Sequence, residues 1–189
     1  MTSNMRGEPA GQRRRLFVFR HGETVWNREG RIQGQGDSPL TRRGAEQAMA
    51  MGETLRDHLS DPATARVFVS PSGRCRQTAA LIADGAGLSY GAAVFHPALF
   101  ELSFGLWEGL LYSEVDARWP RALAAREADL WGYRPQEGES YSMAARRILD
   151  FLASLTGEAS GAGQDSGGDV VIVGHGATGK LLRGLAVET

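Results

Sequence analysis

The chain of 189 residues is poor in cysteine and has no long hydrophobic run. Its one cysteine, Cys75, cannot form an internal disulfide, which predicts a reducing, cytoplasmic location. No apolar segment approaches the ~20 residues that a membrane-spanning helix needs. The apolar run 16–19, behind the arginines at 13–15, is too short for a signal peptide. We therefore expect a cytoplasmic protein without a membrane partner.

An excess of either charge is also absent. The 21 Lys and Arg residues balance 22 Asp and Glu residues, for a formal net charge of -1. Proteins that bind nucleic acids usually carry a basic excess, so we expect no nucleic-acid partner. The length and a hydrophobic content of 42% fit one globular domain. Residues 1–15 are polar and basic and predict a disordered tail, which leaves 16–189 as the folded domain.

Short apolar runs alternate with segments of helical length. The runs are LFVF (16–19), VFV (67–69) and VVIV (170–173). Their β-branched and aromatic residues are typical of strands buried on both faces of a parallel sheet. Helices are predicted over 40–59, 74–87 and 140–155, with end signals at Thr41, Gly85, Gly87, Ser140 and Ser142. The alternation predicts an α/β fold, a three-layer sandwich with a mostly parallel central sheet and helices on both faces.

Groups that bind anions follow each predicted strand. RHGET follows the first run, SPSGR the second and GHGAT the third. In open α/β sheets, ligands bind beyond the carboxyl ends of the strands, so neighbouring strands would bring together Arg20, His21, Arg74 and His175. Guanidinium groups match phosphate oxygens in a two-pronged fashion. Because these groups would repel one another without an anion between them, the pattern predicts a phosphate pocket.

Five longer motifs surround these residues. They read RHGETVWN, RIQGQGDSPLTRRGAEQA, SPSGRCRQTA, ELSFGLWEG and GHGA, and they extend from about residue 16 to about residue 185. In their order and spacing they resemble the motifs of the histidine phosphatase superfamily, in its phosphoglycerate-mutase-like branch. The resemblance implies a single α/β domain with a helical lid inserted at about 104–140.

The same resemblance implies a mechanism. His21 matches the nucleophile of the family, which attacks the phosphoryl group to give a phosphohistidine that water then hydrolyses. Such an imidazole has to be neutral and fixed in one tautomer, and a tight turn at Gly22 would supply the acceptor that fixes it. Arg20, Arg74 and His175 match the phosphate clamp of the family. Neither a metal nor a cofactor is implied.

Glu101, at the start of ELSFGLWEG, matches the general acid of the family. It would protonate the leaving alkoxide, which requires a protonated carboxyl group. Glu108 in the same motif is interpreted as structural. Further contacts with phosphate or substrate are implied for Asn27, Gln33, Gly34 and Gly176.

One segment also suggests a different class of protein. VVIVGHGATGKLL is close to a nucleotide-binding P-loop, with Gly174, Gly179 and Lys180 at the required spacing. The next residue is Leu181, where a Ser or Thr hydroxyl should bind magnesium. The P-loop interpretation is therefore disfavoured.

Within the family, the alternatives are a phosphatase and a cofactor-dependent phosphoglycerate mutase. The resemblance favours a metal-independent, acid-type phosphatase that hydrolyses small phosphorylated metabolites, because the longer basic insert of the mutases is missing after Glu101. A relative that only binds phosphorylated partners is disfavoured, since every matched catalytic position is filled. Aromatic residues of the lid belong either to its core or to the wall of the substrate pocket.

The carboxyl end departs from the family pattern. Relatives usually continue past the last helix into a further strand, whereas this sequence stops at LLRGLAVET. Either the sequence is cut short there or the sheet ends early. A homodimer is one option for the oligomeric state.

Overall fold

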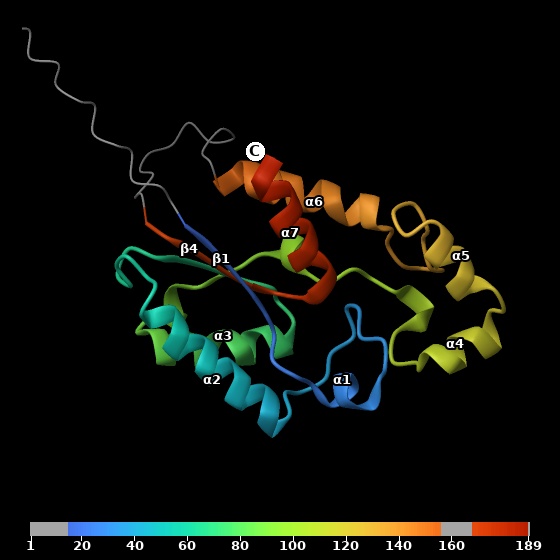
Figure 1. The fold of residues 1–189 in the computed structure, drawn as a ribbon, viewed down its shortest axis with the longest axis horizontal. Helices are drawn as coiled ribbons and strands as arrows, with labels where there is room; N and C mark the ends of the chain where they lie inside the picture. The colour runs from blue at the N-terminus through green and yellow to red at the C-terminus, as the bar shows by residue number, and fades with distance from the viewer. Residues whose placement is uncertain (1–14, 156–167, 189) are drawn as a thin grey trace, which may run out of the picture.

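The computed structural model describes residues 15–155 and 168–188 (Figure 1). In this part of the chain one sheet has the strand order β1-β4-β2-β3, and all its strand pairs are parallel. The strands are β1 (Leu16–Arg20), β2 (Arg66–Val69), β3 (Val94–Phe95) and β4 (Val170–Gly174). The predicted apolar runs thus form three adjacent strands.

The sheet lies between two pairs of long helices. These are α2 (Arg42–Arg56), α3 (Gly73–Ala86), α6 (Tyr141–Leu155) and α7 (Gly176–Glu188). Every residue of the central strand β4 is buried, and its side chains alternate between the two faces. Val170 and Ile172 join the apolar cluster that contains α6 and α7, whereas Val171 and Val173 join the cluster that contains α3. Figure 1 shows these helix pairs on opposite sides of the sheet, which confirms the predicted α/β sandwich.

The ends of the long helices follow the sequence signals closely. The Thr41 side chain caps α2, the Ser140 hydroxyl accepts from the first turn of α6, and Gly87 ends α3 with a left-handed φ of 72°. Gly85 was expected to end α3 but lies inside it. A Cβ there would stand 3.0 Å from the Cα of Gly52 in α2, so glycine at this position lets the two helices pack closely.

The sequence analysis missed β3 and the shortest helices. These are α1 (Val25–Glu29), η1 (Tyr90–Ala92) and η2 (Pro97–Leu99). A two-residue strand carries no periodicity, because the alternation of side chains needs several residues to become visible. Only its pairing with the edge of β2 identifies β3.

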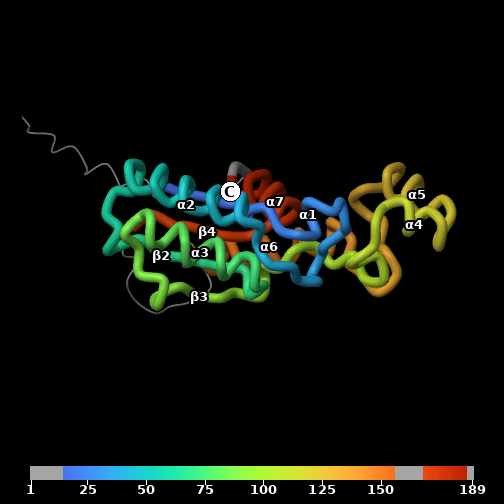
Figure 2. Tube along the Cα trace, turned by 90° about the horizontal axis from the view of Figure 1, so that it is seen from below, coloured from blue at the N-terminus to red at the C-terminus, as the bar shows by residue number. Residues whose placement is uncertain are grey.

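The predicted lid region forms η3 (Gly105–Trp107), α4 (Tyr112–Arg118) and α5 (Ala122–Ala128). In Figure 2, α4 and α5 lie at one end of the molecule, beyond the sandwich. Trp107 is 1% exposed and clusters with Ile32 and Val115, so this aromatic residue belongs to a core of the lid. Tyr112 and Trp131, in contrast, are more than half exposed at 53% and 56%.

Most of the predicted disordered tail, residues 1–14, lies outside the described residues. Arg15, which the prediction placed in the tail, belongs to the fold. Its guanidinium donates to both carboxylate oxygens of Asp169, at 3.1 and 2.9 Å, and its carbonyl accepts from Val170. None of the helices in the described ranges is long and apolar enough to span a bilayer.

Candidate active site

Three loops meet at the carboxyl ends of β1, β4 and β2. Arg20 lies opposite Gly174 in the parallel register, and the backbone N–H of His21 donates to the Gly174 carbonyl at 2.9 Å. His175 follows at once, and its ring centroid lies 5.3 Å from that of His21. Arg74, on the first turn of α3 behind β2, donates to the His175 ring at 3.1 Å. The structure thus brings the side chains of His21, His175 and Arg74 together as predicted, with the Arg20 backbone beside them.

The geometry of His21 leaves one ring nitrogen available for chemistry. Its Nδ1 lies 2.8 Å from the carbonyl oxygen of Gly22. A carbonyl oxygen can only accept, so Nδ1 carries the proton and Nε2 keeps its lone pair. Burial of the ring, with the nearby charges of Arg74 and Arg20, lowers the pKa of His21 from 6.5 to about 4, although the bond to Gly22 opposes this shift. The imidazole is therefore neutral at pH 7, as a nucleophile requires.

Gly22 is needed for a close contact between the His21 loop and α2. A Cβ at this position would lie 2.2 Å from the carbonyl oxygen of Gly44, which is a backbone atom and cannot swing away. Gly22 also donates its N–H to the Thr78 hydroxyl at 3.1 Å. The turn that fixes the tautomer of His21 thus depends on the absence of a side chain.

We expect Gly22→Ala to lower the free energy of unfolding by about 2 kcal/mol, because either the loop or α2 must move. Urea unfolding would measure this loss of stability. The kcat of the enzyme should also fall, because the Gly22 carbonyl that accepts from His21 Nδ1 would shift. Gly91→Ala is the matched control, since nothing lies within 4 Å of its Cβ position. Equal stability of the two variants would contradict the close contact.

The Arg74 guanidinium is buried and already bonded at four of its five N–H groups. Nη1 donates to the Gly36 carbonyl at 2.7 Å and to Asp37 Oδ1 at 3.1 Å. Nη2 donates to the Gly34 carbonyl at 2.7 Å and to His175 Nδ1 at 3.1 Å. Among the described residues, its buried Nε has no partner. Arg74 can thus offer an anion its charge, but not the two-pronged contact that was expected of both arginines.

Arg20 presents the opposite case. Its side chain is exposed, and no hydrogen bond or ion pair of its guanidinium is found within residues 15–155 and 168–188. A Cβ on Gly176 would lie 3.6 Å from Arg20 Cζ and 3.8 Å from Glu101 Oε2. Both side chains thus lie next to the bare Gly176 backbone, and the Arg20 guanidinium remains able to bind an anion with two prongs.

His175 connects Arg74 to Ser70, the residue that follows β2. Because Arg74 donates to its Nδ1, that nitrogen is unprotonated and Nε2–H donates to the Ser70 hydroxyl at 2.7 Å. The Ser72 hydroxyl lies 3.3 Å from the same Nε2. Burial and the charge of Arg74 lower the pKa of His175 well below 6.5. The second imidazole is thus also neutral, and both of its nitrogens are engaged, Nδ1 with Arg74 and Nε2 with Ser70.

Asp37 is a site residue that the sequence analysis missed. Besides its ion pair with Arg74, its carboxylate accepts the backbone N–H of Gly73 at 2.7 Å, which caps the amino terminus of α3. It therefore ties the loop after α1 to the helix that carries Arg74. The only signal in the sequence was indirect: a buried arginine needs an acidic partner.

Glu101 lies at the amino terminus of α7. Its Oε1 accepts the N–H groups of Leu102 at 3.0 Å and Thr178 at 3.1 Å, and its Oε2 accepts that of Ala177 at 3.1 Å. The first turn of the helix, with its positive end, thus binds this carboxylate. The structure brings Glu101 to the same pocket edge as Arg20, with Gly176 next to both.

This arrangement contradicts the P-loop interpretation. In a P-loop the first-turn amides of the helix bind phosphate, but here Glu101 occupies those of Ala177 and Thr178. Lys180 is exposed on α7. Within the described ranges there is also no group of three or more His, Cys, Asp or Glu side chains arranged to hold a metal ion.

The other predicted contact residues lie on α1, for Asn27, and in the loop after it, for Gln33 and Gly34. The buried Gln33 donates its amide to the Thr24 hydroxyl at 2.8 Å, and the Asn27 amide nitrogen lies 3.5 Å from Gln33 Oε1. Gly34 reaches the pocket through its carbonyl, which accepts from Arg74. Asn27 and Gln33 thus brace one another next to the clamp.

Glu108 has the structural role that the sequence predicted. Its carboxylate accepts the backbone N–H groups of Gln35, Gly36 and Phe104, at 2.9, 2.8 and 3.0 Å. These bonds connect the loop after α1 to the base of the lid. The Glu108 carboxylate is therefore fully engaged with backbone N–H groups of these two segments.

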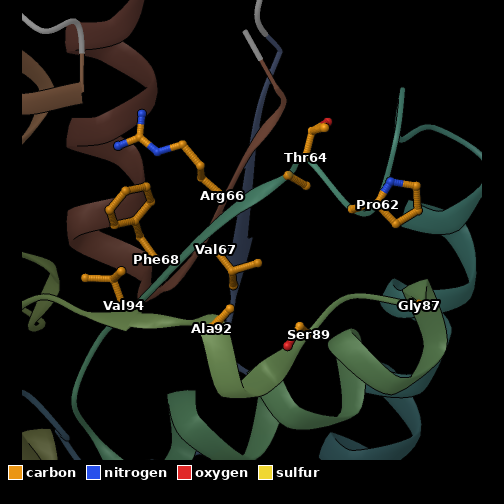
Figure 3. Close-up of a pocket in the computed structure, with 11 residues that line it drawn as sticks. Pro62, Thr64, Arg66, Val67, Phe68, Gly87, Ser89, Ala92 and Val94 are labelled. Carbon is orange, nitrogen blue, oxygen red and sulfur yellow. The ribbon is translucent and has the colours of Figure 1, made fainter. Parts of the chain in front are cut away.

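A cavity of about 610 Å³ lies elsewhere, beside the amino end of β2. Figure 3 shows its lining, with Thr64, Arg66 and Val67 on one side and Ser89 and Val94 on the other. Arg74 and His175 stand at the carboxyl ends of the strands, so this cavity is not part of the candidate active site.

The comparisons with known proteins agree with this geometry. The "Probable phosphoglycerate mutase GpmB" of Erwinia tasmaniensis is 40% identical over 146 residues, which cover 74% of this chain and 63% of that protein. The corresponding protein of Yersinia pestis is 34% identical, covering 90% of this chain and 74% of its own length. For the first of these relatives, the matched part is thus less than two thirds of its length.

Solved structures show the same fold. The mycobacterial glucosyl-3-phosphoglycerate phosphatase Rv2419c in complex with VO3 has a TM-score of 0.77 and 31% identity, covering 93% of this chain and 83% of its own. The α-ribazole phosphatase from Shigella flexneri has a TM-score of 0.72 and 28% identity, covering 92% and 78%. The family model for the histidine phosphatase superfamily (branch 1) matches residues 16–189. With its motifs, fold and converging histidines and arginines, the chain belongs to the histidine phosphatase superfamily, in the phosphoglycerate-mutase-like branch.

Proposed function

We propose that the protein is a phosphatase that hydrolyses small phosphomonoesters through a phosphohistidine on His21. The observation that carries this proposal is the neutral His21 ring, whose free Nε2 stands beside two arginines. In the first step, Nε2 forms a bond to phosphorus while the bond from phosphorus to the ester oxygen breaks. In the second, water attacks phosphorus, the phosphorus–nitrogen bond breaks, and free phosphate leaves with the neutral imidazole restored.

Charge neutralisation in both steps is assigned to the arginines. Arg20 has its whole guanidinium available for the equatorial phosphoryl oxygens, and the buried Arg74 adds its charge. His175 keeps Arg74 in place through Nδ1. The braced amides of Asn27 and Gln33 are assigned to the edge of the phosphate site.

Glu101 is proposed as the general acid that protonates the leaving alkoxide and later takes a proton from the attacking water. The carboxylate is fixed by three backbone N–H groups next to Gly176, close to Arg20.

We expect Glu101→Gln to lower kcat/KM for an alkyl phosphate by about 10²-fold or more, because alkoxides are poor leaving groups that need a proton. For p-nitrophenyl phosphate the loss should be much smaller, since the leaving phenolate is stable without one. Initial rates on both substrates measure this ratio. Glu53→Gln, an exposed change on α2, is the control. Equal losses on both substrates would remove Glu101 from the role of acid.

A mutase activity is the second candidate, favoured by the 40% identity to a protein described as a phosphoglycerate mutase. In a mutase the phosphohistidine passes its phosphoryl group back to a second hydroxyl, so water must be kept out. The phosphatase is supported by the neighbours named as phosphatases and by the absence of a longer insert after Glu101.

A panel of phosphorylated metabolites separates these two activities. Each compound is assayed once for released phosphate and once for isomerisation of a phosphoglycerate. We expect phosphate release that vanadate inhibits and that EDTA leaves unchanged. Isomerisation without free phosphate would replace the phosphatase by the mutase. Loss of activity in EDTA that added Mg²⁺ restores would contradict a clamp made of protein cations alone.

We further propose that the protein acts on such metabolites in the cytoplasm, without a membrane or nucleic-acid partner. The balanced charge supports this proposal, as does the free thiol of Cys75, which is buried and whose pKa burial raises to about 12.

A further inference from the structure

Arg147, on α6, uses three of its five N–H groups on the segment that leads to Glu101 and the other two on Glu139. Nη1 donates to the carbonyl oxygens of Ala98 and Phe100, the latter at 2.8 Å, and Nη2 donates to that of Glu101 at 3.2 Å. Nε and Nη2 donate to the two carboxylate oxygens of Glu139, both at 3.1 Å. A guanidinium group has five N–H donors, so none of them remains free.

Glu139 extends this contact to the other side of Glu101. The same carboxylate accepts the backbone N–H of Ser103 at 3.1 Å, and the Glu139 N–H donates to the Ser103 carbonyl at 2.8 Å. The backbone is therefore held on both sides of Glu101, by Arg147 before it and at it, and by Glu139 after it. Neither side chain belongs to the phosphate clamp.

We propose that Arg147, supported by Glu139, is a positioning residue that keeps the Glu101 carboxyl group in its place at the amino terminus of α7. This inference rests on the proposed role of Glu101 as general acid. Oε1 and Oε2 of Glu101 reach the N–H groups of Thr178 and Ala177 only if the backbone at Glu101 points toward α7. Three carbonyls bound to one rigid guanidinium fix that direction.

Geometry, more than charge, carries this effect. The side chains of Arg147 and Glu139 are 21% and 20% exposed, and an ion pair in contact with water contributes little stability. A lysine has three donors on one nitrogen and cannot span three carbonyls and a carboxylate at once. Arg147→Lys should therefore behave more like a loss of the residue than like a conservative change.

The outer side of Arg147 faces an open groove. A cavity of about 450 Å³ is lined by His96, Ala98, Arg147, Asp150, Phe151 and Ser154. Truncation of Arg147 to alanine would enlarge this groove towards the carbonyls of Ala98 and Phe100. A guanidinium ion from solution has the shape and the donors to occupy the position of the lost side chain.

The test compares Arg147→Ala and Arg147→Lys with Arg146→Ala, an exposed change at the neighbouring position of α6. We expect kcat/KM for an alkyl phosphate to fall by about 10²-fold in both Arg147 variants, because a misplacement of about 1 Å costs that much. For p-nitrophenyl phosphate the loss should stay below about 5-fold, and Arg146→Ala should leave both rates unchanged. A general loss of structure would lower both rates equally, and that result would overturn the proposal.

Two further measurements exclude a merely structural effect. Guanidinium chloride at about 50 mM should restore alkyl-phosphate turnover of Arg147→Ala several-fold, whereas NaCl at the same concentration should not. In a double variant with Glu101→Gln, the Arg147→Ala change should cause almost no further loss on the alkyl phosphate. Additive losses would overturn the proposal.

The same series separates this inference from the proposed function. If Glu101→Gln alone affects both substrates equally, the general acid is misassigned, whatever Arg147 does. If Glu101→Gln is selective for the alkyl phosphate and the Arg147 variants are not, only the positioning role fails. Should Arg147→Ala not fold, Arg147→Lys and Glu139→Gln repeat the comparison, and an unselective loss in both of these folded variants refutes the proposal.

Discussion

Replacing His21 by alanine is expected to reduce kcat for phosphomonoester hydrolysis by at least about 10⁴-fold, because no other described group can carry the covalent intermediate. His175, the other imidazole in the pocket, has both ring nitrogens engaged, with Arg74 and Ser70. It therefore cannot replace the Nε2 lone pair of His21 without breaking the clamp. The residual activity of the variant would come from Arg20 and Arg74 acting on a water molecule.

Two readouts check this expectation. Turnover is measured with p-nitrophenyl phosphate, and the covalent intermediate is measured by alkaline-quenched labelling with ³²P-substrate. His21→Ala should lose both signals, while His58→Ala, an exposed change in the loop after α2, should keep both. Labelling of His21→Ala at the wild-type level would assign the nucleophile to another residue.

Acidification from pH 6.5 to pH 4 is expected to reduce the free energy of unfolding by about 3 kcal/mol through His21 alone. Its pKa is about 4 in the folded protein and 6.5 in the unfolded chain. Between these values the unfolded chain binds a proton that the folded protein does not, so stability rises with pH across this window. A difference of about 2.5 pKa units corresponds to about 3 kcal/mol. His175 acts in the same direction, because burial lowers its pKa too.

Urea unfolding at pH 7, 5.5 and 4.5, with His21→Asn as the comparison, isolates this effect. The variant should lose less stability than the wild type over this range, because it has one buried imidazole fewer. Asp169 contributes in a different window. Burial alone would raise its pKa, but its bonds to Arg15 and Ser60 outweigh this and lower the pKa, so its stabilisation is lost only below pH 3.8. Identical pH slopes for wild type and His21→Asn would contradict the neutral, buried state of His21.

The sequence predicted which side chains meet at the carboxyl ends of the strands better than it predicted the contacts that hold them there. His21, Arg74 and His175 could be placed together because each follows an apolar run, and parallel strands end at one edge. The contact of His21 Nδ1 with the Gly22 carbonyl was also predictable, since a glycine directly after a histidine permits a tight turn. These inferences needed only local patterns and the topology of the sheet.

The difference between Arg74, whose guanidinium is bonded within the protein, and Arg20, whose guanidinium is available, was not predictable. Arg74 is held by carbonyls of Gly34 and Gly36, some 40 positions away in the sequence. Backbone carbonyls carry no sequence signal, so the two-pronged phosphate contact was assigned to both arginines when only Arg20 has its guanidinium available. The contacts of Arg147 with three backbone carbonyls could not be predicted for the same reason.

The lid packs around an apolar cluster of Ile32, Trp107 and Val115, and Phe104 joins this cluster to the one that contains α6 and α7. Tyr112 and Trp131 lie exposed on the lid, so we expect changes at these positions to leave the contacts of His21 and Arg74 intact. We propose that the lid selects the substrate while His21 and the arginines carry out the bond-breaking chemistry, so that the two properties are separable. On this proposal, a new substrate specificity can arise through changes on α4 and α5, in evolution or by grafting, while His21, Arg20 and Arg74 stay the same.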